Sequence, residues 1–122
     1  MAKKILVADD EPHIVRILQD TLVKRGYQVI TAADGQEAVE TALRERPDLI
    51  FLDVMMPQLS GIEVCDQLRN EHQMTVPIFM LTARGQERDL ERGKAAGANQ
   101  YLTKPFSPRG LGDLVDETLG GA

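Results

Sequence analysis

Three aspartates, a threonine and a lysine follow or end short apolar runs of the sequence. They are Asp9, Asp10, Asp53, Thr82 and Lys104. Any one of them could be a helix cap or a solvated side chain, but five in matching positions are hard to obtain by accident. A carboxylate can act as a nucleophile and form an acyl phosphate. A lysine and a hydroxyl can hold phosphoryl oxygens, because phosphoryl transfer depends mainly on positioning and charge neutralisation.

Three carboxylates brought to one place repel each other, so a cation is expected beside them. Two unit charges ~4 Å apart cost about 4 kcal/mol at an effective dielectric near 20. Lys104 is one candidate, and a hard divalent ion with oxygen ligands is the other. Mg²⁺ suits a few carboxylates with several retained waters, and Mn²⁺ could take its place. No histidine or cysteine accompanies the acidic residues as zinc would require, and His13 and His72 are expected at the surface.

The position two residues after Asp53 carries Met55 instead of an acid or a base. An enzyme that rapidly hydrolyses its own aspartyl phosphate would use such a group to activate water. The sequence therefore indicates a site that holds a phosphoryl group for some time, rather than an enzyme that hydrolyses it rapidly. Arg84 could overhang the site, and we expect Met55 and Arg84 together to set the lifetime of the phosphoryl group.

The segments that must position these residues alternate between strand and helix character. Strands are expected at 4–8, 27–31, 48–53, 77–81 and 100–102, with the mixed polarity of 27–31 indicating an edge strand. Helices are expected from Pro12 to before Gly26, from Asp34 to before Pro47, from Ser60 through Leu68, over 85–98, and from Ser107 through Leu119. This alternation predicts an α/β fold with a parallel sheet covered by helices on both faces. Ligands of such sheets bind beyond the carboxyl ends of the strands, where the five residues would gather.

Length and composition bound the class of protein. The chain has 122 residues, 43% of them hydrophobic, and a net charge of −5, which fits one domain and argues against a nucleic-acid-binding surface. The single cysteine, Cys65, excludes an internal disulfide and is expected in the core. No apolar run approaches the ~20 residues of a membrane span or suits a signal peptide, so a cytoplasmic location is expected.

Four motifs together resemble the receiver domain of bacterial two-component response regulators, and they span essentially the whole chain. They are Val7-Ala8-Asp9-Asp10-Glu11, Leu52-Asp53-Val54-Met55-Met56-Pro57 with Gly61, Leu81-Thr82-Ala83, and Tyr101-Leu102-Thr103-Lys104-Pro105-Phe106. The resemblance implies a flavodoxin-like three-layer (βα)5 sandwich, of the chemotaxis single-domain type, whose five-stranded parallel sheet has the order 2-1-3-4-5. Residues 1–119 would form the receiver domain, and residues 120–122 a flexible tail or the stub of a linker.

The same resemblance implies a phosphoacceptor and a metal site. Asp53 would accept the phosphoryl group. Asp10 and Asp53 would bind Mg²⁺ directly, Asp9 would do so through water, and Met55 would contribute its backbone carbonyl. No other cofactor is implied.

The resemblance also implies a phosphate-binding and switch set. Thr82 would be the switch hydroxyl with Ala83 beside it, Lys104 the phosphate-binding lysine, and Tyr101 the aromatic switch residue. The structural residues of the family pattern are Pro57, Gly61 and Pro105, the last following a cis peptide bond.

These roles imply a phosphorylation-activated switch in a phosphorelay. A sensor histidine kinase or a histidine phosphotransfer protein would donate the phosphoryl group from a phosphohistidine. The output would be a change in the surface formed by the fourth helix, fifth strand and fifth helix, read by a downstream protein or a fused effector domain. No direct contact with nucleic acid or membrane is expected. Gly110 and Gly112 each cost up to about 1 kcal/mol in the last helix, which favours a monomer or a weak phosphorylation-dependent dimer.

Two other interpretations use similar features. A haloacid-dehalogenase-like aspartyl-phosphate phosphatase also places a nucleophilic aspartate after a buried strand, but it wants a second aspartate where Met55 stands. A flavin-binding module of the same fold would need a hydroxyl- and glycine-rich loop after the first strand, where Asp9-Asp10-Glu11 would repel the flavin phosphate.

Overall fold

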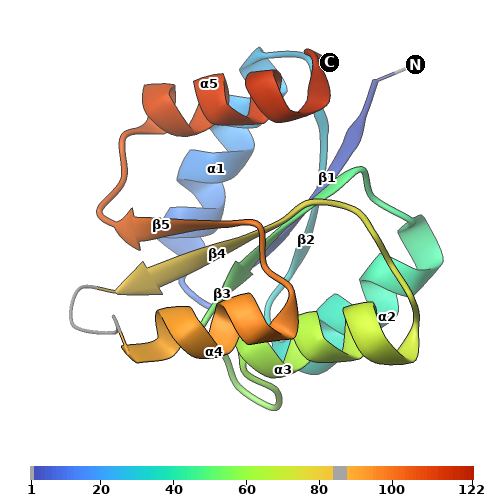
Figure 1. Cartoon of the computed structure of the whole chain (residues 1–122). Helices are drawn as coiled ribbons and strands as arrows, with labels where there is room; N and C mark the ends of the chain where they lie inside the picture. The colour runs from blue at the N-terminus through green and yellow to red at the C-terminus, as the bar shows by residue number, and fades with distance from the viewer. Residues whose placement is uncertain (1, 84–87) are drawn as a thin grey trace.

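A five-stranded parallel sheet forms the centre of the molecule. The computed structural model describes residues 2–83 and 88–122, without the side chains of 88–90. The strands are β1 (Lys4–Ala8), β2 (Gln28–Ala32), β3 (Leu49–Asp53), β4 (Ile78–Ala83) and β5 (Gln100–Lys104). Their order is β2-β1-β3-β4-β5 (Figure 1). The flavodoxin-like order and the edge position of the second strand are therefore confirmed.

Helices cover both faces of this sheet. They are α1 (Pro12–Lys24), α2 (Gly35–Glu45), α3 (Gly61–Asp66) with a π-helical turn (Gln67–Glu71), α4 (Arg88–Ala96) and α5 (Pro108–Leu119). Figure 1 shows α1 and α5 on one face and α2, α3 and α4 on the other, which confirms the three-layer sandwich. None of the described helices has the length and apolar character needed to cross a membrane.

The core lies in two layers because successive side chains of a strand point to opposite faces. Ile5 and Val7 of β1 lie in the layer beneath α1 and α5, whereas Leu6 lies in the layer beneath α2, α3 and α4. Phe51 and Phe79 meet edge to face, with ring centroids 5.5 Å apart and planes at 87°. Strands buried on both faces give the carboxyl edge of the sheet a fixed frame.

Most helix starts follow from local sequence signals. Asp34 caps α2 by accepting from the Glu37 amide at 2.8 Å, and Ser60 caps α3 in a reciprocal capping box with Glu63. Ser107 caps α5 by accepting a hydrogen bond from the Gly110 amide at 3.1 Å. The expected helix 85–98 is described from Arg88 to Ala96, and its first predicted residues lie outside the described part of the chain.

A charged clamp ties α5 to the loop that follows α1. Arg25 lies 2.6 Å from Asp116 and 3.0 Å from Asp113, and the Tyr27 hydroxyl donates to Asp116 at 2.6 Å. A Cβ added at Gly112 would overlap the Arg25 guanidinium. Arg25 thus crosses α5 at Gly112. The absence of a side chain there leaves room for the guanidinium, which explains a glycine at a position where helix propensity disfavours it.

We expect Gly112→Ala to lower the free energy of unfolding by about 1 kcal/mol, the lower end of the cost of overpacking. Alanine normally stabilises a helix interior relative to glycine by up to about 1 kcal/mol. Here the new methyl group would displace Arg25 from Asp113 and Asp116. Urea denaturation of the variant and the wild type measures the difference.

Gly110→Ala is the matched control, because its Cβ would meet only Ser107, at an ordinary 3.4 Å. This variant should gain the stability that alanine gives a helix. In an Arg25→Ala background, Gly112→Ala should also become stabilising. A stabilising Gly112→Ala in the wild-type background would contradict the role given to the clamp.

Candidate functional site

The carboxyl ends of four strands bring the predicted site residues to one edge of the sheet. Asp9 and Asp10 directly follow β1, and Asp53 ends β3. Thr82 lies in β4 and Lys104 ends β5. The strand register places Ala8 beside Leu52 and Ala83 beside Lys104, so the strand ends are level with one another.

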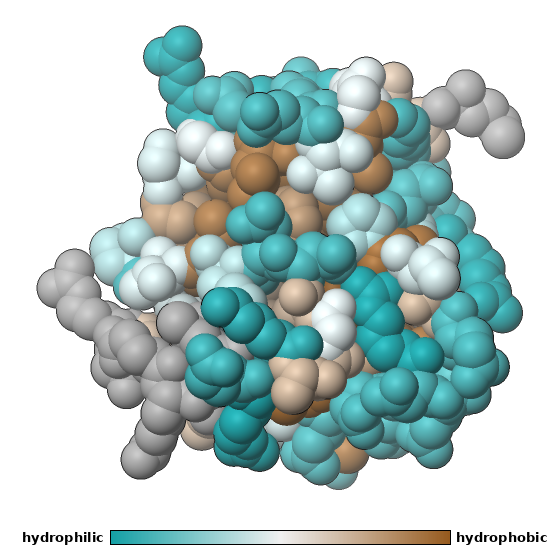
Figure 2. All heavy atoms as spheres, viewed as in Figure 1, coloured by the Kyte–Doolittle hydropathy of each residue, from teal (hydrophilic) through white to brown (hydrophobic). Residues whose placement is uncertain are grey.

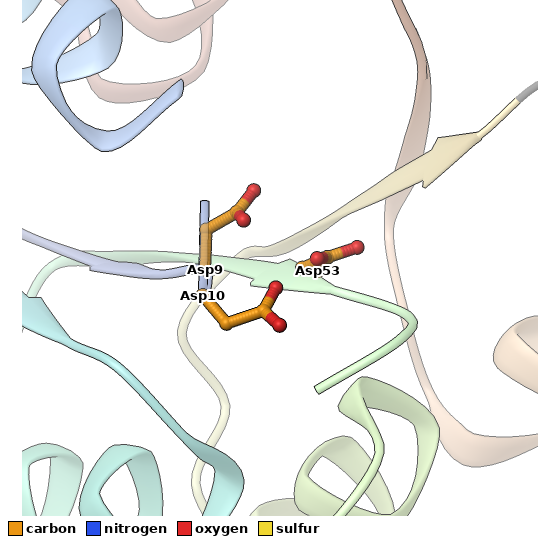
Figure 3. Close-up of side chains that lie close together, drawn as sticks. All are labelled: Asp9, Asp10 and Asp53. Atoms are coloured by element: carbon orange, nitrogen blue, oxygen red, sulfur yellow. The ribbon is translucent and has the colours of Figure 1, made fainter. Parts of the chain in front are cut away.

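The acidic residues converge on one small volume. Figure 3 shows the side chains of Asp9, Asp10 and Asp53 close together beyond the strand ends, and one carboxylate oxygen of each lies within 4.8 Å of the others. Asp9 is 2% exposed and Asp53 is 4% exposed, whereas Asp10 is exposed to solvent. Burial removes much of the solvent screening, so the mutual repulsion of these groups is stronger than on an open surface.

Lys104 supplies positive charge at this site. Its Nζ lies 2.9 Å from Asp9 Oδ2, 2.8 Å from Glu11 Oε1 and 3.4 Å from Asp53 Oδ2. Burial acts to lower the pKa of Lys104, but the contacts with Glu11 and Asp9 and the charge of Asp53 outweigh it and raise the pKa. The ammonium group therefore stays charged and offsets part of the carboxylate repulsion.

The pKa of Asp53 is raised, whereas an ion pair lowers the pKa of a carboxylate at the surface. Burial, and then the charge of Asp9, raise this pKa to about 7, although Lys104 and the Met55 amide act to lower it. The Met55 amide donates to Asp53 Oδ1 at 3.3 Å. The positive charge that the protein supplies near Asp53 is thus too small to offset its burial and the charge of Asp9.

Glycine and proline residues position the loop after β3. A Cβ on Gly61 would overlap the Asp53 carbonyl oxygen, a backbone atom that cannot move aside, and the Gly61 amide donates to Val54 O at 3.0 Å. The Pro57 carbonyl accepts from the Gly35 amide at 3.1 Å, which joins this loop to the start of α2. These contacts hold the backbone on both sides of Asp53.

The switch residues of the family pattern lie on β4 and β5. Thr82 is buried at 3% exposure and Ala83 beside it is exposed. The Tyr101 hydroxyl is buried and has no hydrogen-bond partner among the residues that the structure describes. The peptide bond before Pro105 is cis, as the resemblance implies. Arg84, the second residue expected to influence phosphoryl lifetime, lies outside the described residues.

Two residues at or near the site were missed from the sequence. Glu11 bonds to Lys104 and was treated only as part of a strand-ending acidic motif. Gly93 of α4 was not named as a site residue, but a Cβ there would come within 2.6 Å of the Tyr101 hydroxyl. A sequence signal existed for Glu11, because glutamate is a poor residue for the cap position before Pro12.

Comparison with known proteins identifies the family. The model of the response regulator receiver domain matches residues 5–116, so the chain belongs to the receiver domain family of two-component response regulators. The chain is 59% identical over 119 residues to PhoP, the alkaline phosphatase synthesis transcriptional regulatory protein of Bacillus subtilis (strain 168). That alignment covers 98% of this chain and 49% of PhoP, and the chain spans about half the length of the curated relatives it matches.

Solved structures agree with this assignment. The chemotaxis protein CheY4 of Vibrio cholerae superposes with a TM-score of 0.88 at 38% identity, covering 97% of this chain and 99% of that one. The receiver domain of the Francisella response regulator 1452 gives a TM-score of 0.88 at 32% identity, with 97% of each chain covered. As a receiver domain the chain is a signalling switch, which favours this interpretation over the phosphatase and the flavin-binding module.

From the raised pKa of Asp53 we predict how the free energy of unfolding of the metal-free protein depends on pH. The stability that protonated Asp53 contributes is fully present below its unfolded pKa of about 4 and is lost as the pH rises through about 7. Asp53→Asn removes this dependence. In EDTA at pH 8 the variant should therefore exceed the wild type in free energy of unfolding by at least about 1 kcal/mol, the order of one pKa unit.

Urea denaturation from pH 4 to pH 8 measures this difference, which should shrink as the pH falls. A variant less stable than the wild type at pH 8 would mean that attraction to Lys104 outweighs burial and repulsion from Asp9.

Proposed function

We propose that this receiver domain accepts a phosphoryl group on Asp53 from a phosphohistidine of a sensor histidine kinase or a histidine phosphotransfer protein. The observation that carries the proposal is the buried Asp53, grouped with Asp9 and Asp10 and 3.4 Å from Lys104. A carboxylate nucleophile, an acidic metal site and a phosphate-binding ammonium are the parts that this transfer needs.

The acidic cluster fits Mg²⁺, with Mn²⁺ as a substitute. Three carboxylates and the absence of nearby imidazole or thiol ligands in the cluster suit a hard divalent ion. Asp9 Oδ2 is buried and, although it contacts Lys104, makes no aligned hydrogen bond with any described residue. Asp10 and Asp53 would hold the ion directly with the Met55 carbonyl, and Asp9 through water. The ion would neutralise the negative charge of the acceptor and of the incoming phosphoryl oxygens.

The transfer step is a displacement at phosphorus. A carboxylate oxygen of Asp53 forms a bond to the phosphorus while the bond from phosphorus to the donor imidazole nitrogen breaks. The nitrogen keeps the electron pair of that bond, so the step involves no oxidation or reduction. Lys104 binds one oxygen of the transferred group, and the Thr82 hydroxyl, next to Ala83, binds another.

The phosphoryl group is proposed to persist. The Met55 side chain is 62% exposed and offers no acid or base to activate water. Slow autodephosphorylation suits a signal better than turnover, so the domain assists its own phosphorylation without acting as a general phosphatase.

Phosphorylation would shift the domain between two states through Thr82 and Tyr101. Moving a population from 1:99 to 99:1 needs about 5.5 kcal/mol of differential interaction. Hydrogen bonds to charged groups contribute about 1.5–3 kcal/mol each, so about two to four new contacts to the phosphoryl group supply this amount. The Tyr101 hydroxyl, buried and without a hydrogen-bond partner in the described part of the chain, is a group that such a shift could release or rearrange.

The proposed output surface is formed by α4, β5 and α5. Figure 2 shows apolar atoms reaching the surface between β5 and α5, the elements that carry the partly buried Leu102 and Leu114. We place the receiver domain at residues 1–119 with 120–122 as a tail or linker stub, in the cytoplasm, as a monomer or a weak dimer after phosphorylation. PhoP is named a transcriptional regulatory protein, so a fused effector domain is one proposed route of output.

Incubation with Mg²⁺ and acetyl phosphate should add the mass of one phosphoryl group to the wild-type protein. The adduct should be labile to hydroxylamine, because an acyl phosphate reacts with that nucleophile. Asp53→Asn should remove the adduct, and EDTA should prevent it. Intact-protein mass spectrometry measures all three.

Asp20→Asn serves as the matched control, since Asp20 is exposed on α1 and pairs with Arg16. It should be phosphorylated like the wild type. A stable adduct of full yield on Asp53→Asn would contradict the assignment of the acceptor.

Gly93→Ala should move Tyr101 toward solvent, because the new methyl group would crowd its buried hydroxyl. Burial raises the pKa of Tyr101 in the wild type. In the variant this pKa should fall toward about 10, the value of an exposed tyrosine. Absorbance titration near 295 nm in a Tyr27→Phe background follows Tyr101 alone, because the chain has two tyrosines. An unchanged pKa would mean that α4 moves instead of Tyr101.

A further inference from the structure

Glu11 occupies the N-cap position of α1 without capping the helix. Its backbone is extended, with φ −95° and ψ 108°, and its side chain makes no hydrogen bond to the first turn. Serine, threonine, aspartate or asparagine would satisfy a free amide there and stabilise the helix by about 1 kcal/mol. The carboxylate of Glu11 is directed instead to the phosphate-binding lysine of the site.

Glu11 contacts His13 Nε2 at 3.7 Å through Oε2, and two shorter contacts direct it toward the site. Its backbone amide donates to Asp9 Oδ1 at 2.9 Å, and its Oε1 accepts from Lys104 Nζ at 2.8 Å. Asp9 is buried at the end of β1, so one of these contacts is made to a fixed part of the frame. Glu11 therefore belongs to the acidic site through Lys104, although it lies outside the group of carboxylates suited to a metal.

The distances around Lys104 show that Glu11 and Asp9 hold it more closely than Asp53 does. Glu11 accepts an aligned hydrogen bond at 2.8 Å and Asp9 Oδ2 lies at 2.9 Å, whereas Asp53 Oδ2 lies at 3.4 Å. The hydrogen bond to Glu11 also lowers the pKa of that carboxyl, so Glu11 stays charged. A phosphoryl group on Asp53 would place new anionic oxygens beside Asp53, and Lys104 would have to turn toward them.

We propose that Glu11 is a positioning residue that competes with the phosphoryl group on Asp53 for the ammonium of Lys104. It keeps Lys104 bound in the unmodified domain and so weakens phosphoryl binding. The inference rests on the proposed function, because it assigns a competitor at the same site. It also sets Glu11 apart from Asp9 and Asp10, whose proposed role is to hold the metal.

Two variants of Glu11 distinguish the effect of its contact with Lys104 from the effect of its negative charge. Glu11→Gln keeps the length of the side chain but removes its charge. Glu11→Asp keeps the charge but is one methylene shorter, and aspartate at an N-cap favours the backbone amides of its own helix. Because aspartate is also a good cap, Glu11→Asp should fold at least as stably as the wild type.

The probe is beryllium trifluoride, a stand-in for the phosphoryl group, titrated at saturating Mg²⁺ and one fixed pH. Both Glu11 variants should bind it about threefold to tenfold more tightly than the wild type, the range expected for loss of a partly exposed ion pair with a charged hydrogen bond. Glu37→Gln is the charge-matched control, since Glu37 is exposed at the start of α2 beside the cavity that Asp10 lines. It should change the dissociation constant by less than about twofold, the effect of an exposed charge in water.

Three results would overturn the proposal. Tighter binding by Glu11→Gln alone would show a charge effect without competition for Lys104. Unchanged binding by both variants would show that Glu11 does not restrain Lys104, and weaker binding by Glu11→Asp would show that Glu11 prepares Lys104 for the phosphoryl group. Failure of the wild type to bind beryllium trifluoride is a separate result, which would remove the proposed function itself.

Discussion

The ammonium group of Lys104 among buried carboxylates is the interaction on which the site depends. Asp9 and Asp53 are nearly inaccessible to water, and their negative charges must be offset within the protein or by a bound cation. Lys104 offsets only part of that charge, as the raised pKa of Asp53 indicates. A site with this deficit of positive charge favours binding of a divalent ion. A new anion at the site would also attract Lys104 toward itself.

The sheet stabilises this arrangement because the charged residues lie at the ends of strands whose positions are fixed by packing. β1 and β3 are buried on both faces, and β5 delivers Lys104 from the edge of the sheet. Gly61 allows the start of α3 to pass against the Asp53 backbone, so the loop after β3 cannot drift away from the carboxylates. Rigid positioning of this kind is what phosphoryl transfer requires of a protein. Tyr101, the proposed switch residue, packs against Gly93 of α4 beside this frame.

Sequence patterns were sufficient for the elements and for the residues at the strand ends. Apolar runs, caps and breakers act over a few residues, so β1, β3 and α2 could be predicted from local chemistry. The strand order came from the resemblance to receiver domains, because alternation of strands and helices alone does not decide which strands are neighbours. The edge position of β2 was visible in its mixed polarity.

Contacts between distant parts of the chain could not be predicted in the same way. Glu11 and Lys104 are 93 residues apart in the sequence, and Arg25 and Asp116 are 91 apart. Glycines inside a helix, such as Gly93 and Gly112, look like defects because helix propensity counts only the cost of a missing side chain. Their value lies in the space left for Tyr101 and Arg25, which only the packed fold defines.

The most direct test of the central claim is a crystal structure of the protein with Mg²⁺ and beryllium trifluoride. The account predicts the beryllium on a carboxylate oxygen of Asp53, Mg²⁺ among Asp9, Asp10 and Asp53, and Lys104 Nζ within hydrogen-bond distance of a fluorine. Lys104 should then have left Glu11, which it contacts at 2.8 Å in the unmodified domain. Beryllium trifluoride bound to Asp53 with Lys104 still on Glu11, or bound elsewhere, would contradict the account.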